Sequence, residues 1–119
     1  MQKTLVIGAS SNPIQYSHLA IQKLMAAGHP VEAIGREAFE IGTTKVVSEK
    51  IDFKDIHTIT LYLNKERQKE YADYIIALNP KRIIFNPGAE NPELFNRTSI
   101  LGIEAIEACT LVMLAAGTY

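Results

Sequence analysis

Residues 4–17 read TLVIGASSNPIQYS, and this stretch decides the fold. Thr4–Ile7 is a short apolar and β-branched run, which predicts a strand covered on both faces. Gly8 allows a tight turn, and the small residues after it allow an anion to approach the backbone at the start of a helix, which we predict Ser17 to cap. The stretch therefore indicates a strand, a phosphate-binding loop and a helix, although a plain strand-to-helix turn has a similar composition.

The rest of the chain continues this alternation. Further strands are predicted at Val31–Ile34, Thr58–Leu63, Arg82–Phe85 and Ile103–Ile106, with a short one at Lys45–Val47 inside an otherwise irregular region. Helices are predicted from Ser17 to a stop at Gly28, from an N-cap at Asn64 to Leu78, and from Asn91-Pro92 to about Leu101. The pattern predicts an α/β, three-layer Rossmann-like fold with one parallel sheet of about five strands.

Composition limits the classes of partner. The chain has 119 residues, of which 47% are hydrophobic, and a formal net charge of -1. These values predict a single domain over residues 1–119 and do not favour nucleic acid or an anionic membrane as a partner. The lone cysteine, Cys109, and the lack of a signal-peptide pattern indicate the cytoplasm. The apolar segment Leu111–Ala116 makes a homodimer possible.

The loops after the first two strands exclude one common cofactor pattern. A dinucleotide fingerprint that began at Gly8 would need glycine at the positions of Ser10 and Pro13. After the second strand, Arg36 stands near where an acidic residue would normally bind the ribose of NAD. An arginine favours a ligand with an extra ribose phosphate, such as coenzyme A or NADP, unless it is simply a surface residue. Lys45 and Lys65 are the next candidate cations.

Several short motifs together resemble a known family. They are GAS at residues 8–10, NP at 12–13, YSH at 16–18, EIG at 40–42, Gly88 and Cys109. The set is similar to the small stand-alone CoA-binding domain family, itself similar to the CoA-binding domain of succinyl-CoA synthetase alpha subunits. The resemblance extends from about Thr4 to Cys109. It implies a Rossmann-like domain that binds coenzyme A with the pyrophosphate on the first loop and the adenine near the loops after the second and third strands.

On this basis the loops supply the candidate ligand-binding residues. They are Gly8, Ala9, Ser10, Asn12, Pro13, Tyr16 and Ser17 in the first loop, Gly35 and Arg36 in the second, Tyr62 and Asn64 in the third, and Asn86 and Gly88 in the fourth. Tyr62 suits either a pocket wall or the core, and Gly88 suits either close approach of a ligand or an ordinary turn. The chain departs from the family pattern at Gly35-Arg36, Leu63-Asn64 and Asn86.

No residue pattern indicates catalysis or a metal. The three histidines His18, His29 and His57 lie on different predicted elements, and Cys109 suits a small buried hydrophobe better than a redox role. We therefore expect a non-catalytic carrier or sensor of coenzyme A or acyl-CoA. The alternatives are an NADP- or acyl-CoA-dependent enzyme subunit whose chemistry a partner supplies, and a domain that serves only as an interaction surface.

Overall fold

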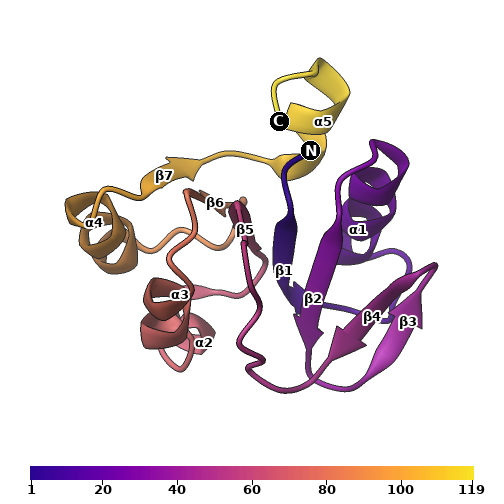
Figure 1. Cartoon of the computed structure of the whole chain (residues 1–119), viewed down its shortest axis with the longest axis horizontal. Helices are drawn as coiled ribbons and strands as arrows, with labels where there is room; N and C mark the ends of the chain where they lie inside the picture. Colours follow the sequence, from indigo (N-terminus) through magenta and orange to yellow (C-terminus); the bar gives the residue numbers. More distant parts are fainter.

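Seven strands form one sheet in the computed structural model, which describes residues 1–119 (Figure 1). The strand order is β3-β4-β2-β1-β5-β6-β7. The strands are β1 (Thr4–Ala9), β2 (Val31–Gly35), β3 (Phe39–Ile41), β4 (Thr44–Val47), β5 (Thr58–Leu61), β6 (Arg82–Phe85) and β7 (Glu104–Glu107). Every pairing is parallel except that of β3 with β4. The predicted α/β, Rossmann-like fold is confirmed.

The sheet is wider than predicted because residues 39–47 form an antiparallel hairpin at its edge. Ile41 pairs with Thr44, so Gly42 and Thr43 make a two-residue turn. Gly42 has a φ of +57°, a conformation that glycine adopts at little cost and that such turns favour. Val46 and Val47 of β4 then pair in parallel with β2. The prediction of an irregular region with one short strand was therefore incomplete, and the sheet is mixed rather than wholly parallel.

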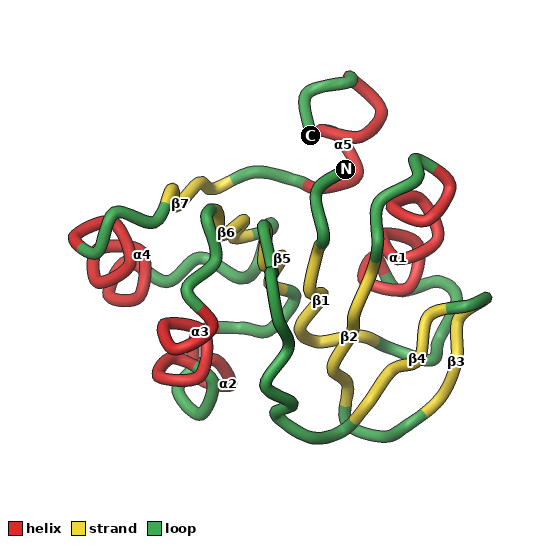
Figure 2. Tube along the Cα trace, in the orientation of Figure 1, coloured by secondary structure: helices red, strands yellow, loops and turns green.

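Five helices cover the sheet. They are α1 (Tyr16–Ala26), α2 (Lys65–Gln68), α3 (Ala72–Leu78), α4 (Pro92–Ile100) and α5 (Thr110–Ala116). Figure 2 shows α1 apart from α2, α3 and α4, with the chain crossing from β4 to β5 in a loop. No helix is both long and apolar enough to cross a membrane.

The second predicted helix is divided into two helices in the structure. The pattern from Asn64 to Leu78 predicted one helix, but the structure ends α2 at Gln68 and begins α3 at Ala72. The side chain of Gln68 is fully buried, and its amide nitrogen donates to the carbonyl oxygens of Leu63 and Ala89, each at 2.7 Å. This tertiary contact fixes α2 against two loops. The local pattern of apolar residues does not reveal it.

The core lies on both faces of the sheet. On one face, Val6 of β1 packs with Ile21 and Leu24 of α1. On the other face, Leu5 and Ile7 belong to a larger cluster that includes residues of α3 and α4. This alternation along β1 is what a central strand covered by helices on both sides requires. The C-terminal segment forms α5, and Leu114 packs against the α1 side of the core.

A polar and aromatic cluster lies at the amino-terminal ends of the strands. Figure 1 shows the two chain termini close together in this region. Arg82 is only 7% exposed, and it donates hydrogen bonds to Thr58 Oγ1 at 3.1 Å and to Gln2 Oε1 at 2.9 Å. Its guanidinium lies 4.5 Å from the centre of the Tyr119 ring. The Tyr119 ring also packs against His29, with their ring centres 4.9 Å apart. We refer to these residues as the Arg82 cluster.

Candidate functional site

A cavity of about 750 Å³ opens at the carboxyl ends of β1, β2 and β5, where Rossmann-like sheets bind ligands. Several predicted site residues line it: Gly8, Ala9, Ser10, Tyr16, Ser17, Gly35, Arg36 and Tyr62. The first three loops therefore converge on one space, as the strand order requires. Pro87 lines it from the fourth loop.

The first loop is shaped by close contacts between backbones. Gly8 has a φ of +98°, and a Cβ there would lie 3.0 Å from the carbonyl carbon of Tyr62. A Cβ on Gly35 would lie 2.6 Å from the carbonyl oxygen of Ala9. Both glycines therefore let the end of β1 pack between its two neighbouring strands. The need for glycine comes from the protein's own packing, whatever the loop binds.

The start of α1 faces this loop. The helix begins at Tyr16, and its N-cap Gln15 makes no side-chain hydrogen bond, so Ser17 is not the cap that the sequence predicted. Ser17 instead accepts a hydrogen bond from the backbone N–H of Ser10 at 3.1 Å, through Oγ. The bond fixes the loop on the first turn of the helix. With no capping side chain, the positive end of α1 is available to an anion in the cavity.

Four predicted site residues lie outside the cavity lining, in positions with local structural explanations. Asn12 Oδ1 accepts the backbone N–H of Ile14 at 3.1 Å, and Pro13 is exposed in the same turn. Asn64 caps α2 as predicted, with Oδ1 accepting the N–H of Arg67 at 2.9 Å. Gly88 has a φ of +91° and nothing within 4 Å of the position of a Cβ, which fits a turn.

Asn86 is a fifth predicted residue outside the lining. It is 1% exposed, and its Nδ2 donates to Thr60 Oγ1 at 2.6 Å and to the carbonyl oxygen of Leu61 at 2.9 Å. Its Oδ1 accepts the N–H of Thr110 at 2.9 Å. The amide thus joins β5, β6 and the start of α5. Its hydrogen-bonding groups are used inside the protein and not at the cavity.

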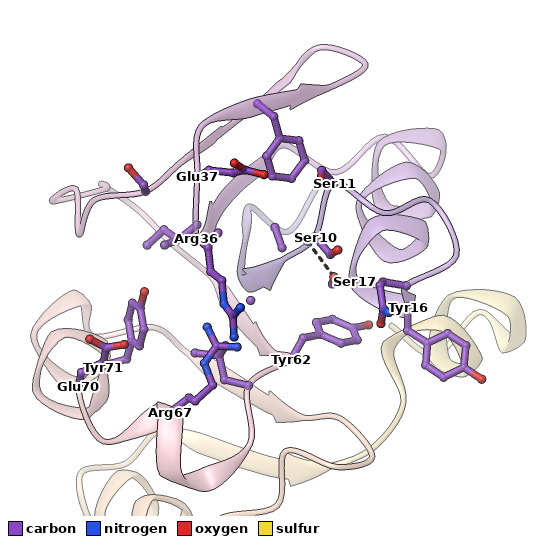
Figure 3. A pocket seen from close by; sticks show the side chains of 18 of the residues that line it. Ser10, Ser11, Tyr16, Ser17, Arg36, Glu37, Tyr62, Arg67, Glu70 and Tyr71 are labelled. Carbon is purple, nitrogen blue, oxygen red and sulfur yellow. Dashed lines mark hydrogen bonds between the residues drawn. The ribbon is translucent and has the colours of Figure 1, made fainter.

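Tyr62 forms part of the cavity wall and part of the interior. Its ring lines the cavity, while its hydroxyl oxygen is buried without a hydrogen-bond partner. Burial is the main cause that raises the pKa of Tyr62 to about 12. The phenol therefore stays protonated at neutral pH. Figure 3 shows the ring extending toward Ser17 and the start of α1.

Two arginines contribute positive charge. Arg36 follows β2 and is exposed, and Arg67 lies on α2 and is half-buried. Both line the cavity, and Figure 3 shows both side chains reaching into it from different elements. Arg67 was not among the site residues predicted from the sequence. Lys45 and Lys65 are not in the cavity lining.

Metal-binding geometry is not found. No group of three or more His, Cys, Asp or Glu side chains is placed to hold a metal ion. His18 Nδ1 lies 2.9 Å from the carbonyl oxygen of Ser10, whereas His29 and His57 lie near Arg82. Cys109 is partly exposed and precedes α5, outside the cavity lining.

Comparison with protein families assigns the chain to one family. A family model described as a CoA binding domain matches residues 2–115. The chain belongs to the CoA binding domain family. The match confirms the resemblance that the GAS, NP and YSH motifs suggested, and it covers the first loop, the cavity and both arginines. A comparison with curated proteins gave no match.

Solved structures show the same fold as this CoA binding domain. An uncharacterized protein is 42% identical, with a TM-score of 0.96 over 100% of this chain and 98% of that one. A protein from Thermus thermophilus is 17% identical, with a TM-score of 0.87 over 99% and 90% of the two chains. A conserved hypothetical protein from Pyrococcus furiosus is 23% identical, with a TM-score of 0.79 over 94% and 98%. At the last two identities the likeness supports the fold alone.

Proposed function

We propose that this protein binds coenzyme A or an acyl-CoA and acts as a non-catalytic carrier or sensor. The observation that carries the proposal is a CoA binding domain match over residues 2–115 in a chain whose first loop and α1 face a cavity of about 750 Å³. That volume lies within the range of roughly 300–1,000 Å³ typical of small-molecule sites. We further propose that residues 1–119 act as one binding domain in the cytoplasm.

The chemistry of the cavity suits an anionic nucleotide. Ser10 and Ser11 line it beside the positive end of α1, which is the expected place for the pyrophosphate. Arg36 directly follows β2, where Rossmann-like folds contact the ribose, and its guanidinium suits a ribose phosphate. Phe39 and Tyr71 also line the cavity and offer ring surface for the adenine.

Differential stabilisation tests the proposal. A ligand that binds only the folded state raises its stability by about 2.7 kcal/mol at a hundredfold excess over Kd. We expect coenzyme A to raise the melting temperature, and NAD at the same concentration to leave it nearly unchanged. Stabilisation by NAD equal to that by coenzyme A would contradict the proposal.

A charge variant locates the ligand more safely than a glycine variant, because a side chain at Gly8 would collide with the backbone of Tyr62. Ser11 is exposed and lines the cavity. Ser11→Glu places a carboxylate beside the expected pyrophosphate and should weaken coenzyme A binding at least about tenfold through repulsion. Ser11→Gln is the matched neutral control and should bind more tightly than Ser11→Glu. Equal affinities would place the phosphates elsewhere.

Arg36 also favours a second candidate, an enzyme subunit that uses NADP. NADP carries a ribose phosphate, so the same arginine would suit it. The melting experiment therefore includes NADP as a separate ligand. Stabilisation by NADP that exceeds that by coenzyme A would favour this candidate and would direct the search to a partner that supplies the chemistry.

A further inference from the structure

Two guanidinium groups enter one cavity from opposite neighbours of β1. Arg36 comes from the segment after β2, and Arg67 comes from α2, which follows β5. Figure 3 shows both side chains directed into the cavity, with their nitrogen-bearing ends in its central part. Like charges that face a shared space repel each other, and a bound anion offsets that repulsion because it attracts both of them. The arrangement therefore suits a group with more than one negative charge.

Neither guanidinium is neutralised by an ion pair. The salt bridges join Lys3 to Glu32, Lys54 to Asp52, Lys69 to Glu66 and Arg97 to Asp73. Carboxylates are close in the sequence, since Glu37 adjoins Arg36 and Glu70 lies three positions after Arg67, and both line the cavity. The arginine forks are nonetheless free to bind a ligand phosphate.

The backbone that carries Arg67 is held firmly. Its N–H donates to the Asn64 cap at 2.9 Å, and the next residue, Gln68, is fully buried with its amide bonded to two loop carbonyls. A fixed backbone lowers the entropy lost when the guanidinium binds a ligand. Arg67 is therefore better prepared for binding than an arginine on a free loop.

We propose that Arg67 acts with Arg36 to bind the phosphate monoester on the ribose of the ligand. The inference rests on the proposed function, because it assumes an adenine nucleotide with its pyrophosphate over the first loop. The ribose then lies near the end of β2, beside Arg36. A phosphate monoester carries about 1.5 to 2 negative charges at neutral pH, and two guanidinium forks match its charge and geometry.

Calorimetric titration with coenzyme A and dephospho-coenzyme A tests the pair, because these ligands differ only in that phosphate. We expect the unmodified protein to bind coenzyme A roughly tenfold or more tightly. Arg67→Met keeps most of the apolar stem and removes the charge. It should reduce the preference to about threefold or less by weakening coenzyme A binding alone. Arg36→Met should do the same.

The control is Arg97→Met. Arg97 forms a salt bridge with Asp73 at 3.2 Å, and it does not line this cavity. This variant should keep the full preference for coenzyme A. If Arg67→Met proves too unstable to titrate, Arg67→Lys keeps the charge without the fork and should give an intermediate preference. Melting curves of each variant separate loss of folding from loss of binding.

The outcomes separate this inference from the proposed function. Equal weakening of both ligands by Arg67→Met would overturn the inference and place Arg67 at another group, such as the pyrophosphate. Equal affinity of the unmodified protein for both ligands would also overturn it, while coenzyme A binding itself would stand. No measurable binding of either ligand would contradict the proposed function.

Discussion

Arginines at the two ends of the strands have opposite roles. We call these ends the amino-terminal edge and the carboxyl-terminal edge of the sheet. At the amino-terminal edge, Arg82 is buried, bonds to neutral oxygens of Thr58 and Gln2, and packs on the Tyr119 ring. At the carboxyl-terminal edge, Arg36 and Arg67 face a cavity and form no salt bridge. A cation whose donors are used inside the protein contributes to folding. A cation whose donors face a cavity is available for binding. Substitutions at the amino-terminal edge should therefore change mainly the free energy of unfolding, and those at the carboxyl-terminal edge mainly the affinity for the ligand.

The largest effect should come from Arg82→Ala. The change removes the stem from a buried site, two hydrogen bonds and the contact with the Tyr119 ring. We expect the free energy of unfolding in urea to fall by about 2–4 kcal/mol. Arg82→Lys should lose less because it keeps the charge and most of the stem. An unchanged unfolding midpoint for Arg82→Ala would contradict the conclusion that Arg82 contributes to folding.

Gly35→Ala should show that packing requires a glycine at the carboxyl-terminal edge, beside the cavity. The added Cβ would lie 2.6 Å from the carbonyl oxygen of Ala9, a backbone atom that can move only with the first loop. We expect a loss of roughly 2 kcal/mol in unfolding free energy, together with weaker coenzyme A binding. Gly88→Ala is the control, since no atom lies within 4 Å there and only its φ of +91° resists the change. A greater loss of stability in the control would contradict the packing argument.

Mild acid should weaken the amino-terminal edge. Burial lowers the pKa of His29 and of His57, and the positive charge of Arg82 lowers both further. A histidine with a lowered pKa in the folded state favours unfolding when it is protonated, so stability should fall as the pH drops below about 6.5. His29 Nδ1 accepts the N–H of Gln2 at 3.1 Å, and protonation at this atom would break that bond.

Urea unfolding at pH 7.5 and at pH 5.5 measures this effect, because the ordinary pKa values of carboxyl groups lie well below that range. The midpoint should be lower at pH 5.5. The double variant His29→Asn/His57→Asn should reduce the difference between the two midpoints. A difference that persists in full would assign the pH dependence to other groups.

The smallest effect on stability is expected for Arg36→Ala. Arg36 is exposed and in no salt bridge, so the free energy of unfolding should change by no more than about 0.5 kcal/mol. The preference of the Arg36→Ala variant for coenzyme A over dephospho-coenzyme A should fall, as is expected for Arg36→Met. A large loss of stability would show that this cation also supports folding and would blur the contrast with Arg82.

The central strands could be predicted because burial on both faces produces short, nearly continuous apolar runs, as in Thr4–Ile7 and Arg82–Phe85. Three features could not be predicted from the sequence. The β3–β4 hairpin consists of two short strands with mixed polarity, of which only Lys45–Val47 in β4 was predicted. The division of the predicted second helix depends on the distant contacts of Gln68. Helix α5 begins without a capping side chain.

The candidate site shows the same division. Gly8, Gly35 and Arg36 could be placed at the cavity because they lie at, or directly after, the carboxyl ends of strands that are neighbours in a parallel sheet. Asn86 could not be excluded from it, because its rotation toward Thr60 depends on a tertiary hydrogen bond. Arg67 was missed because its position depends on where α2 lies over the cavity, which a one-dimensional pattern does not specify.

The buried amide of Gln68 also has a consequence for motion. One nitrogen bonds to carbonyl oxygens in the loops after β5 and β6, and Oε1 accepts from Asn91 at 2.9 Å. These segments should therefore shift as a rigid unit, and α2 should not open alone to admit a ligand. Gln68→Glu would replace the shared donor with a carboxylate facing two carbonyls. Amide hydrogen exchange should then accelerate together in both loops, far beyond the residue that was changed.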